Sequence, residues 1–301
     1  MLDADTVVYS ASDLSAAATC EWALMRRLDA KLGRIVASPE PPDAMLERTA
    51  LLGDRHEHLM LERLRRSHEV VEIARPAVTE IAAAVQQSER ALRAGAEVVF
   101  QAAFFDGRFL GYADFIIRTP GASLAEPTYE VYDTKLARSA KITALLQLAA
   151  YSEQLQSLGI ATGEQVHLVL GDGRTSSHRL QDILPVYRMR RARLQSLIDT
   201  RLQDSGATEW NDPRYSACGR CALCAEQVSL HRDVLLVANL RLGQRDRLRA
   251  AGIDSIDRLA ALAPAPDRGP APQVGGMSEA ALATLSQQAR LQLASAPHRP
   301  E

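Results

Sequence analysis

The sequence predicts an α/β protein in which helices flank a mixed sheet and a small helical module follows at the carboxyl end. Three observations lead to this fold class. Segments with helical and with strand periodicity alternate along most of the chain. A hairpin pattern surrounds Asp106 and Gly107, so two neighbouring strands are expected to be antiparallel. Two short helical segments on either side of Ala251, Gly252 and Ile253 outline a helix-hairpin-helix.

The amino-terminal part of the chain predicts three helices and one short strand. Ser and Asp capping residues open the first helix, which contains Cys20 and Trp22. Pro76 interrupts the chain after the strand, and Gly95 ends the third helix. The helices are expected over residues 10–33, 42–66 and 77–93, and the strand over residues 69–73.

The central part of the chain supplies the remaining strands of the predicted sheet. Residues 97–118 form the hairpin, a third strand starts near Tyr129, and another runs from Gln165 to a Gly-Asp-Gly turn. A helix with an apolar stripe is expected over residues 141–158, and an arginine-rich helix over residues 183–203.

The carboxyl-terminal part divides into smaller segments. Residues 264–275 are rich in proline and glycine, as linkers are. The last amphipathic segment lacks a predicted partner, and we therefore expect the natural protein to continue beyond it. The predicted parts of the chain are an α/β core over residues 8–205, a cysteine cluster region over residues 206–232, a helix-hairpin-helix-like module over residues 233–263, and a linker with a terminal helix over residues 264–301.

Composition and charge place few limits on the partners of this protein. A hydrophobic content of 47% with 24% charged residues is ordinary for a folded globular chain. The net charge of −2 neither favours nor excludes nucleic acid, because DNA affinity depends on local basic patches. The chain has no run of about 18 apolar residues, and its first segment has acids where a signal peptide needs basic residues. A cytoplasmic location is therefore expected.

A carboxylate and a lysine are expected on one face of the predicted strand that starts near Tyr129. Asp133 and Lys135 project to the same side because side chains alternate along a strand. The D-x-K tripeptide alone is weak evidence, since residues 29–31 repeat it within a helical pattern. Asp114 supplies the context, because it ends the second strand of the hairpin. Two adjacent strands then each present a carboxylate at one edge of the sheet.

This pair of carboxylates is suited to a hard cation. Two carboxylates with a nearby backbone carbonyl match the oxygen ligands that Mg²⁺ and Mn²⁺ prefer. A bound ion would polarise a scissile phosphate and lower the pKa of an attacking water. Lys135, one of only three lysines in the chain, would orient that water or offset the charge that develops at phosphorus.

Side chains on two predicted helices can complete this site. His56 lies just inside one helix, where an imidazole can add a metal ligand, and Glu57 and His58 compete for that role. Gln147 and Tyr151 lie four residues apart on the helix that follows the lysine, so they share one side. Both are candidates for positioning the metal-bound water or a phosphate. Taken singly, each of these side chains can equally be structural.

Four motifs follow one another along the chain: G-x-x-H-E, G-Y-A-D-F, Y-E-V-Y-D-T-K and Q-L-A-A-Y. In this order they resemble the motifs of RecB-type PD-(D/E)xK nucleases, over roughly residues 8–262. The resemblance implies a divalent-metal-dependent DNA nuclease that acts in repair or recombination. It favours exonuclease action on single strands or duplex ends, together with a helicase partner or a fused helicase.

The resemblance also implies a fold and a set of site residues. The fold would be a restriction-endonuclease-like core, with a central mixed sheet and flanking helices. Asp114, Asp133 and the carbonyl of Thr134 would hold the Mg²⁺ or Mn²⁺ ion. His56 would add a ligand, and Lys135 would be the catalytic lysine.

The four cysteines form a second candidate site. Cys218, Cys221 and Cys224 form C-x-x-C-x-x-C, and Cys20 is the only other cysteine. Four thiolates suit a 4Fe-4S cluster or tetrahedral zinc, and closely spaced triplets favour the cluster. AddB-type and CRISPR-associated adaptation nucleases are similar, with one cysteine before the core and three after it, although their last spacing is longer. The ion would tie the amino-terminal helix to the carboxyl-terminal module.

Two arginine-rich segments can contact DNA phosphates or form ordinary solvated helix faces. The arginines are Arg188, Arg190, Arg191 and Arg193 in one helix, and Arg241, Arg245, Arg247 and Arg249 near the helix-hairpin-helix.

Two alternative functions also stay open. The chain can be a non-catalytic DNA-binding scaffold of a helicase-nuclease assembly, or a zinc protein that mediates protein contacts only.

Overall fold

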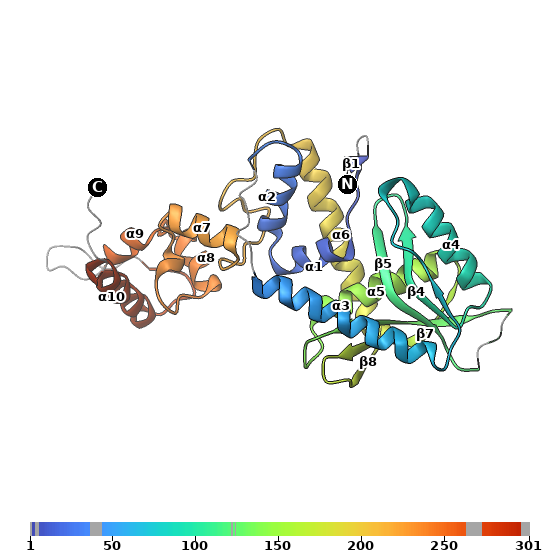
Figure 1. Cartoon of the computed structure of the whole chain (residues 1–301). Coiled ribbons are helices and arrows are strands. Elements are labelled where there is room, and N and C mark those ends of the chain that lie inside the picture. The colour runs from blue at the N-terminus through green and yellow to red at the C-terminus, as the bar shows by residue number, and fades with distance from the viewer. Residues whose placement is uncertain are drawn as a thin grey trace. The chain divides into compact units, whose positions relative to one another are not determined.

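The computed structural model contains a mixed six-stranded sheet (Figure 1). Its strands are Val70–Glu72 (β3), Val98–Phe105 (β4), Leu110–Arg118 (β5), Thr128–Lys135 (β6), Ala161–Leu170 (β7) and Thr175–Arg179 (β8). They lie side by side in chain order; β3 with β4 and β6 with β7 are parallel pairs, and the other pairs are antiparallel. Helices flank the sheet, so the predicted α/β class with a mixed sheet is confirmed.

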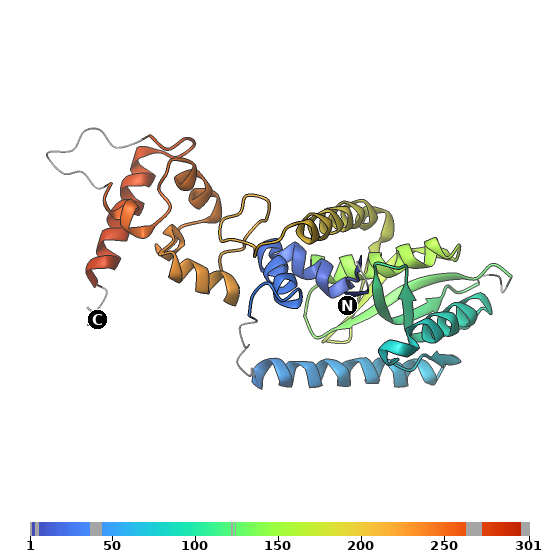
Figure 2. The ribbon, with the colours of Figure 1, turned by 90° about the horizontal axis from the view of Figure 1, so that it is seen from above.

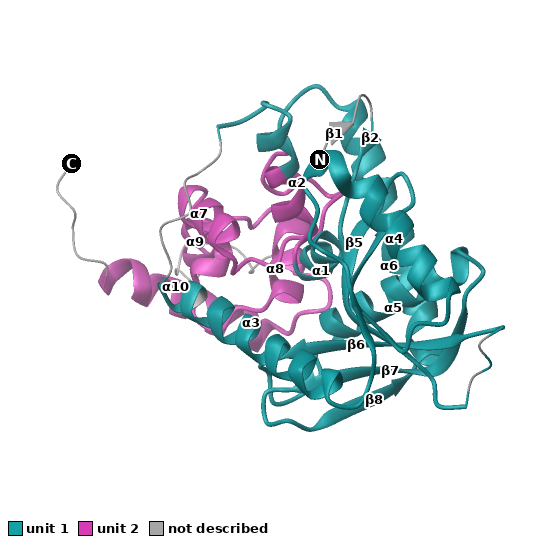
Figure 3. Cartoon of the chain, turned by 45° about the vertical axis from the view of Figure 1, so that its right-hand side comes forward, with its two compact units in different colours: residues 1–19, 28–207 teal, residues 20–27, 208–301 magenta. Residues whose placement is uncertain are grey.

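Two compact units make up the chain (Figure 3). Unit 1 comprises residues 1–19 and 28–207 and contains the six-stranded sheet. Unit 2 comprises residues 20–27 and 208–301, so a short amino-terminal segment belongs with the carboxyl-terminal part. The structure describes residues 2–3, 6–36, 44–121, 123, 125–262 and 273–295.

Helices cover both faces of the sheet in unit 1. Its helices are Ala11–Thr19 (α1), Ala44–Arg65 (α3), Val78–Glu80 (η1, a 3-10 turn), Ile81–Arg93 (α4), Ile142–Ser157 (α5) and Leu180–Gln203 (α6). On one face Leu64 of α3 packs with Phe115 of β5, and Figure 2 shows α3 and α5 on opposite sides of the sheet. On the other face Tyr129 Oη of β6 donates to the Leu92 carbonyl of α4. α1 and α6 pack against α5.

The central strands β4 and β5 are buried on both faces, which explains their nearly continuous apolar sequences. Val98 and Val99 of β4 are successive residues with opposite orientations, and both are fully buried. Phe115 and Ile116 of β5 repeat this pattern. The hairpin that joins the strands confirms the prediction made from Asp106 and Gly107.

The structure corrects two sequence-based expectations in unit 1 and at its border. Residues 10–33 form two helices, α1 and Glu21–Lys31 (α2), because the chain leaves the helical conformation at Cys20. There the Cys20 sulfur accepts backbone N–H groups, as described below. β8 was not expected, since its sequence T-S-S-H-R has no apolar alternation; it is the edge strand after the Gly-Asp-Gly turn. A short pair of strands, Leu2–Asp3 (β1) and Thr6–Val7 (β2), precedes α1.

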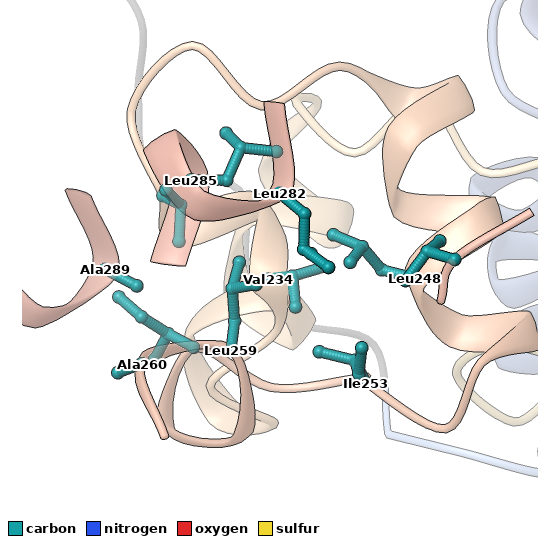
Figure 4. Close-up of a cluster of buried hydrophobic side chains, with 11 residues drawn as sticks. Val234, Leu248, Ile253, Leu259, Ala260, Leu282, Leu285 and Ala289 are labelled. Atoms are coloured by element: carbon teal, nitrogen blue, oxygen red, sulfur yellow. The ribbon is translucent and has the colours of Figure 1, made fainter. Parts of the chain in front are cut away.

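Unit 2 has a helical core of its own (Figure 4). Its elements are Ala222–Leu230 (α7), Val234–Leu236 (η2, a 3-10 turn), Leu242–Ala250 (α8), Ile256–Ala260 (α9) and Glu279–Ser295 (α10). α8 and α9 form the predicted pair of short helices, and Gly252 between them has a φ of 78°. Leu248 and Leu259 pack there with Leu282 and Leu285 of α10, so the terminal helix does have a partner. Most of the expected linker, namely residues 264–272, lies outside the described residues.

Among the helices of the described ranges, none combines the length and the apolar character needed to cross a membrane.

Candidate active site and metal centre

Asp114 and Asp133 come together where β5 and β6 separate. The antiparallel register pairs Phe115 with Tyr132 and then ends. The next residue on each strand is one of the two aspartates, and Asp133 is only 5% exposed. The backbone N–H of Thr134 donates to Oδ2 of Asp114 at 3.4 Å, which ties the two strands together. Asp114 lies in the middle of β5 and not at its end, as the sequence had predicted, because β5 stays paired with β4 on both sides of this position. The structure therefore places both carboxylates at one point of the sheet.

The two carboxylates repel each other, and Lys135 compensates for one of them. Burial, together with the neighbouring Asp133 carboxylate, raises the pKa of Asp114 well above its usual range. Lys135 Nζ lies 2.9 Å from Oδ1 and 2.7 Å from Oδ2 of Asp133. Even so, the buried Oδ2 accepts no hydrogen bond of good geometry from the described residues. One ammonium thus faces two carboxylates, and the site can take up a proton or a cation.

The contribution of Asp114 to the stability of the protein without divalent metal is expected to fall as the pH rises above about 4. The pKa of Asp114 is higher in the folded protein than its ordinary value of 3.8, so the folded state binds the proton more tightly. This stabilisation is complete below the unfolded pKa and is lost as the pH rises through the folded pKa. Melting temperatures between pH 4 and pH 8 will check it, and Asp114→Asn should remove this part of the decline. An unchanged slope in that variant would refute the assignment.

Glu57 of α3 is the third acid at this point. It is half-buried and lines the same pocket as Asp114 and Asp133. Burial raises the pKa of Glu57, although a hydrogen bond from the Gln101 amide opposes this shift. From the sequence, Glu57 was expected only as a competitor of His56 for the role of metal ligand. The structure places Glu57 in the pocket with the carboxylates of Asp114 and Asp133.

The two neighbouring histidines lie elsewhere. His56 is absent from the described residues that line the two pockets beside the carboxylates. Its Nε2 lies 3.2 Å from the carbonyl oxygen of Val169 in β7. His58 is exposed, and its Nδ1 lies 2.7 Å from the carbonyl oxygen of Asp54 one turn earlier in α3. The expected histidine ligand is thus not gathered with the acids.

Two open pockets meet at the carboxylates. The first has a volume of about 480 Å³ and the second about 610 Å³. Both are lined by Glu57, Asp114, Lys135 and Gln147, so the acids can be reached from two sides. Tyr151 lines the first pocket, where burial raises the pKa of its hydroxyl, which therefore remains protonated. The two α5 residues that the sequence predicted at the site are both present.

The donor set of the first pocket fits a divalent ion. Glu57, Asp114 and Asp133 supply carboxylate oxygens, the hard ligands that Mg²⁺ and Mn²⁺ prefer. The buried Oδ2 of Asp133 has unused acceptor capacity, and a shared cation would remove the repulsion that raises the pKa of Asp114. The carboxylate oxygens of these three acids do not form a compact metal-ligand group in the structure. Among the described residues, the four cysteines are the one such group.

Gln101 and Arg75 are among the polar residues of the first pocket that the sequence did not predict. Gln101 interrupts the apolar run V-V-F-Q-A-A-F-F of β4, and this isolated polar residue in a buried strand was an available signal. Arg75 lies in the loop after β3, with its guanidinium carbon 5.7 Å from the centroid of the Tyr112 ring. No pattern in the sequence connects this loop with the acids.

The four cysteines of unit 2 form one compact group, as predicted. The Sγ atoms of Cys20, Cys218, Cys221 and Cys224 all lie within 4.8 Å of one another. Cys20 Sγ is 3.6 Å from Cys224 Sγ, and Cys218 Sγ is 3.9 Å from Cys224 Sγ. All four are free thiols, and Cys20 and Cys224 are buried. This group can hold a metal ion or a cluster.

Hydrogen bonds organise this cysteine centre. The backbone N–H groups of Cys218 and Ala23 donate to Cys20 Sγ at 3.3 and 3.4 Å. The Cys224 thiol and then these N–H groups lower the pKa of Cys20 to about 5, although burial opposes the shift. The same pairing raises the pKa of Cys224, so one thiol of the pair ionises readily and its partner keeps the proton. A cation at the centre would favour thiolates throughout.

Two of the sulfur separations can be compared with the spacing around a single ion. A tetrahedral ion with zinc–sulfur bonds of about 2.3 Å places its four sulfurs about 3.8 Å apart. The separations of 3.6 and 3.9 Å are close to that spacing, and all four sulfurs lie within 4.8 Å of one another. A 4Fe-4S cluster lies between its cysteines with four irons and four sulfides, and therefore spreads the thiolates further.

Arginines near the helix-hairpin-helix make contacts within unit 2. Arg245 is 4% exposed, and its Nη2 lies 2.6 Å from Oδ2 of the buried Asp233. Arg247 is exposed and donates to the Gly276 carbonyl at 2.6 Å, and Arg249 donates to the Asn211 carbonyl at 3.5 Å. The sequence left these arginines as DNA contacts or a solvated helix face, and the burial of Arg245 fits neither.

Arginines of α6 show the same tendency in unit 1. Arg188 Nε donates to Glu153 at 2.7 Å. Arg191 pairs with both Glu153 and Asp106, and its Nε donates to the Tyr9 hydroxyl at 3.0 Å. This network joins α5, α6 and the hairpin turn. Arg190 is exposed on α6.

Replacing Asp233 by alanine is expected to lower the free energy of unfolding of unit 2 by about 3–5 kcal/mol, because Arg245 would stay buried without its partner. Both tryptophans of the chain, Trp22 and Trp210, lie in unit 2, so intrinsic fluorescence during urea unfolding measures this change. Asp257→Ala is the control. Its ion pair with Arg232 is about half exposed and should contribute less than about 1 kcal/mol. Equal losses in the two variants would contradict the prediction.

Comparison with known proteins gives only distant similarities. No family model and no curated protein matches the sequence. Among solved structures, the chain is similar to a proposed exonuclease from Eubacterium rectale, with a TM-score of 0.39 and 14% identity over 73% of this chain and 87% of that one. It is also similar to the protein SSO0001, with a TM-score of 0.31 and 14% identity over 68% of this chain and 80% of that one. TM-scores this low assign no role to any residue.

Proposed function

We propose that the protein is a divalent-metal-dependent DNA nuclease of the RecB-like PD-(D/E)xK type. One observation carries the proposal: Asp114 of β5 meets Asp133 and Lys135 of β6 where the pairing of these two adjacent strands stops, in a pocket that also receives Glu57. A structural ion pair needs only one carboxylate for one lysine. Additional half-buried acids beside that pair suit a Mg²⁺ or Mn²⁺ ion that acts on a phosphate.

Each residue of the catalytic group has a proposed task. When bound, the ion polarises the scissile phosphodiester and lowers the pKa of an attacking water. Asp114, Asp133 and Glu57 hold the ion, with the carbonyl of Thr134 as a further ligand. Lys135 offsets the negative charge that develops on the phosphate oxygens during hydrolysis. Glu57 takes the place that the sequence resemblance gave to the neighbouring histidine.

Three other pocket residues position the substrate. Tyr151 keeps its proton and can donate a hydrogen bond to a phosphate oxygen. Gln147 lines both pockets and can bind either a water or a phosphate on the path between them. Arg75 supplies a guanidinium on the pocket wall, where it can bind the phosphate next to the scissile one.

DNA is the proposed substrate, with exonuclease action on single strands or duplex ends. The two pockets that meet at the acids give a strand an entrance and an exit at the site. A role in repair or recombination, beside a helicase partner or a fused helicase, is proposed from the motif resemblance alone.

The experiment follows end-labelled single- and double-stranded DNA with protein purified without oxygen. Degradation should require Mn²⁺ or Mg²⁺, stop with EDTA, and fall about 10²–10³-fold in Lys135→Ala. Lys31→Ala is the matched control, because Lys31 is exposed on α2. A wild type that binds DNA but never cuts it would instead support a non-catalytic DNA-binding scaffold of a helicase-nuclease assembly.

The cysteine centre is proposed to be a structural zinc site. The sulfur separations of 3.6 and 3.9 Å carry this choice over the 4Fe-4S cluster that the motif resemblance implies. Metal analysis of protein purified without oxygen should find one zinc per chain. Stoichiometric iron with sulfide, and absorbance near 400 nm, would show that the cluster is the occupant.

A further inference from the structure

A strained residue lies in the middle of β4, next to the first pocket. Gln101 has a φ of 57°, in the left-handed region that residues with a Cβ rarely adopt. Among the described residues, the other non-glycine residues with positive φ are Asn211, Arg232 and Asn239, and all three lie in turns. A left-handed residue within a central strand therefore needs a local cause.

The strain occurs directly across from Asp114 on the neighbouring strand β5. The register pairs Phe100 with Phe115 and Ala102 with Ala113, and it omits the position between them. Gln101 and Asp114 occupy that omitted position on the two strands. A residue that leaves the ladder no longer follows the regular alternation of side chains. The irregularity thus changes the direction of one side chain beside the acids.

The Gln101 side chain reaches Glu57. Its Nε2 donates a hydrogen bond to Oε1 of Glu57, and both residues line the first pocket. An amide donor orients a carboxylate without cancelling its charge. An arginine or lysine at this position would compete with a cation for the same oxygens. The neutral donor leaves the carboxylate able to bind a metal ion.

We propose that Gln101 is a positioning residue for the divalent-metal site. Its left-handed backbone directs the amide toward α3, and the amide holds the Glu57 carboxylate beside Asp114 and Asp133. This inference rests on the proposed function, because it concerns the same metal site. Backbone strain of this kind persists where the surrounding structure enforces it, and it is common at functional sites.

Three variants separate the roles of the backbone and the side chain. Gln101→Gly relaxes the backbone and removes the amide, whereas Gln101→Met keeps the length and the strain but cannot donate. Asn239→Gly is the control, since Asn239 has a similar φ of 65° and belongs to unit 2. For each variant we would measure the Mn²⁺ dissociation constant without DNA, the melting temperature without metal, and kcat and KM on DNA.

Both Gln101 variants are expected to bind Mn²⁺ about 10- to 100-fold more weakly, the usual loss when the hydrogen-bond partner of a metal ligand is removed. Their kcat should fall while KM for DNA stays within about twofold, because the DNA contacts are unchanged. Gln101→Gly should melt at or above the temperature of the wild type, since glycine adopts a positive φ freely. Asn239→Gly should bind Mn²⁺ like the wild type.

Two results would overturn the inference, and they are distinguishable. If Gln101→Gly binds Mn²⁺ with wild-type affinity, Gln101 is a structural residue and only this inference fails. If the wild type neither binds Mn²⁺ nor cuts DNA, the proposed nuclease function fails and takes the inference with it. Gln101→Gly alone decides the question if the Met variant does not fold.

Discussion

Replacing Asp133 by alanine is expected to reduce metal-dependent DNA hydrolysis by about 10³-fold or more. Asp133 is the carboxylate that contacts Lys135, and it lies beside Asp114 of the neighbouring strand. Under the proposed function, its loss removes a metal ligand and the anchor of the catalytic lysine together. Metal ions contribute several kcal/mol to reactions of this type, and about 4 kcal/mol corresponds to a thousandfold change in rate. Initial rates on end-labelled DNA will measure the effect.

The same variant should fold well, which distinguishes a catalytic role from a structural one. Without Asp133, the repulsion that helps to raise the pKa of Asp114 disappears, so the metal-free protein should be no less stable than the wild type. Asp172→Ala is the control: Asp172 pairs with Arg174 in the turn between β7 and β8, and its loss should leave cutting unchanged. Full activity in Asp133→Ala, or equal losses in both variants, would contradict the proposed site.

Replacing Cys224 by serine is expected to remove the metal ion from unit 2 and destabilise that unit by about 3 kcal/mol or more. Cys224 is fully buried and lies within 4 Å of two other sulfurs of the centre. Structural zinc contributes about 10–16 kcal/mol of apparent binding energy in small zinc-dependent folds, and binding energy there is folding energy. Unit 2 also has an apolar core, so we expect a weakened unit rather than complete unfolding.

Tryptophan fluorescence reports this loss directly. The centroids of the Trp22 and Trp210 rings lie 4.9 Å apart in unit 2, and Trp22 belongs to the same segment as Cys20. A destabilisation of 3 kcal/mol lowers the melting temperature of a domain of about this size by roughly 12–24 °C. Ala222→Ser is the matched control, because Ala222 is exposed between the cysteines. An unchanged transition and metal content in Cys224→Ser would exclude a structural metal centre.

Sequence patterns predicted the parts of this fold that depend on periodicity and residue type. The alternation of side chains along β6 puts Asp133 and Lys135 on one side of the sheet. The hairpin pattern predicted β4 and β5, and β5 pairs with β6. The cysteine group follows from residue type alone, because the four thiols of a chain with no others were the only candidates. These arguments need little knowledge of tertiary packing.

Other features depend on packing that the sequence does not contain. Successive residues of a helix point about 100° apart, so the choice between His56 and Glu57 depends on how α3 lies on the sheet. Arg245 has the same local context as a solvated arginine, and only the buried carboxylate of Asp233 places it inside. Likewise, the Cys20 sulfur at the break between α1 and α2 accepts the N–H of Cys218, which is 198 residues away along the chain.

The most direct test of the central claim is a titration of Mn²⁺ into metal-free wild-type protein, followed by electron paramagnetic resonance, with the cysteine centre intact. We predict one Mn²⁺ per chain in the wild type, none in the Asp114→Asn/Asp133→Asn double variant, and DNA cutting that rises in proportion to Mn²⁺ occupancy. Mn²⁺ binding that is absent from the wild type, or unchanged in the double variant, would contradict the proposed site.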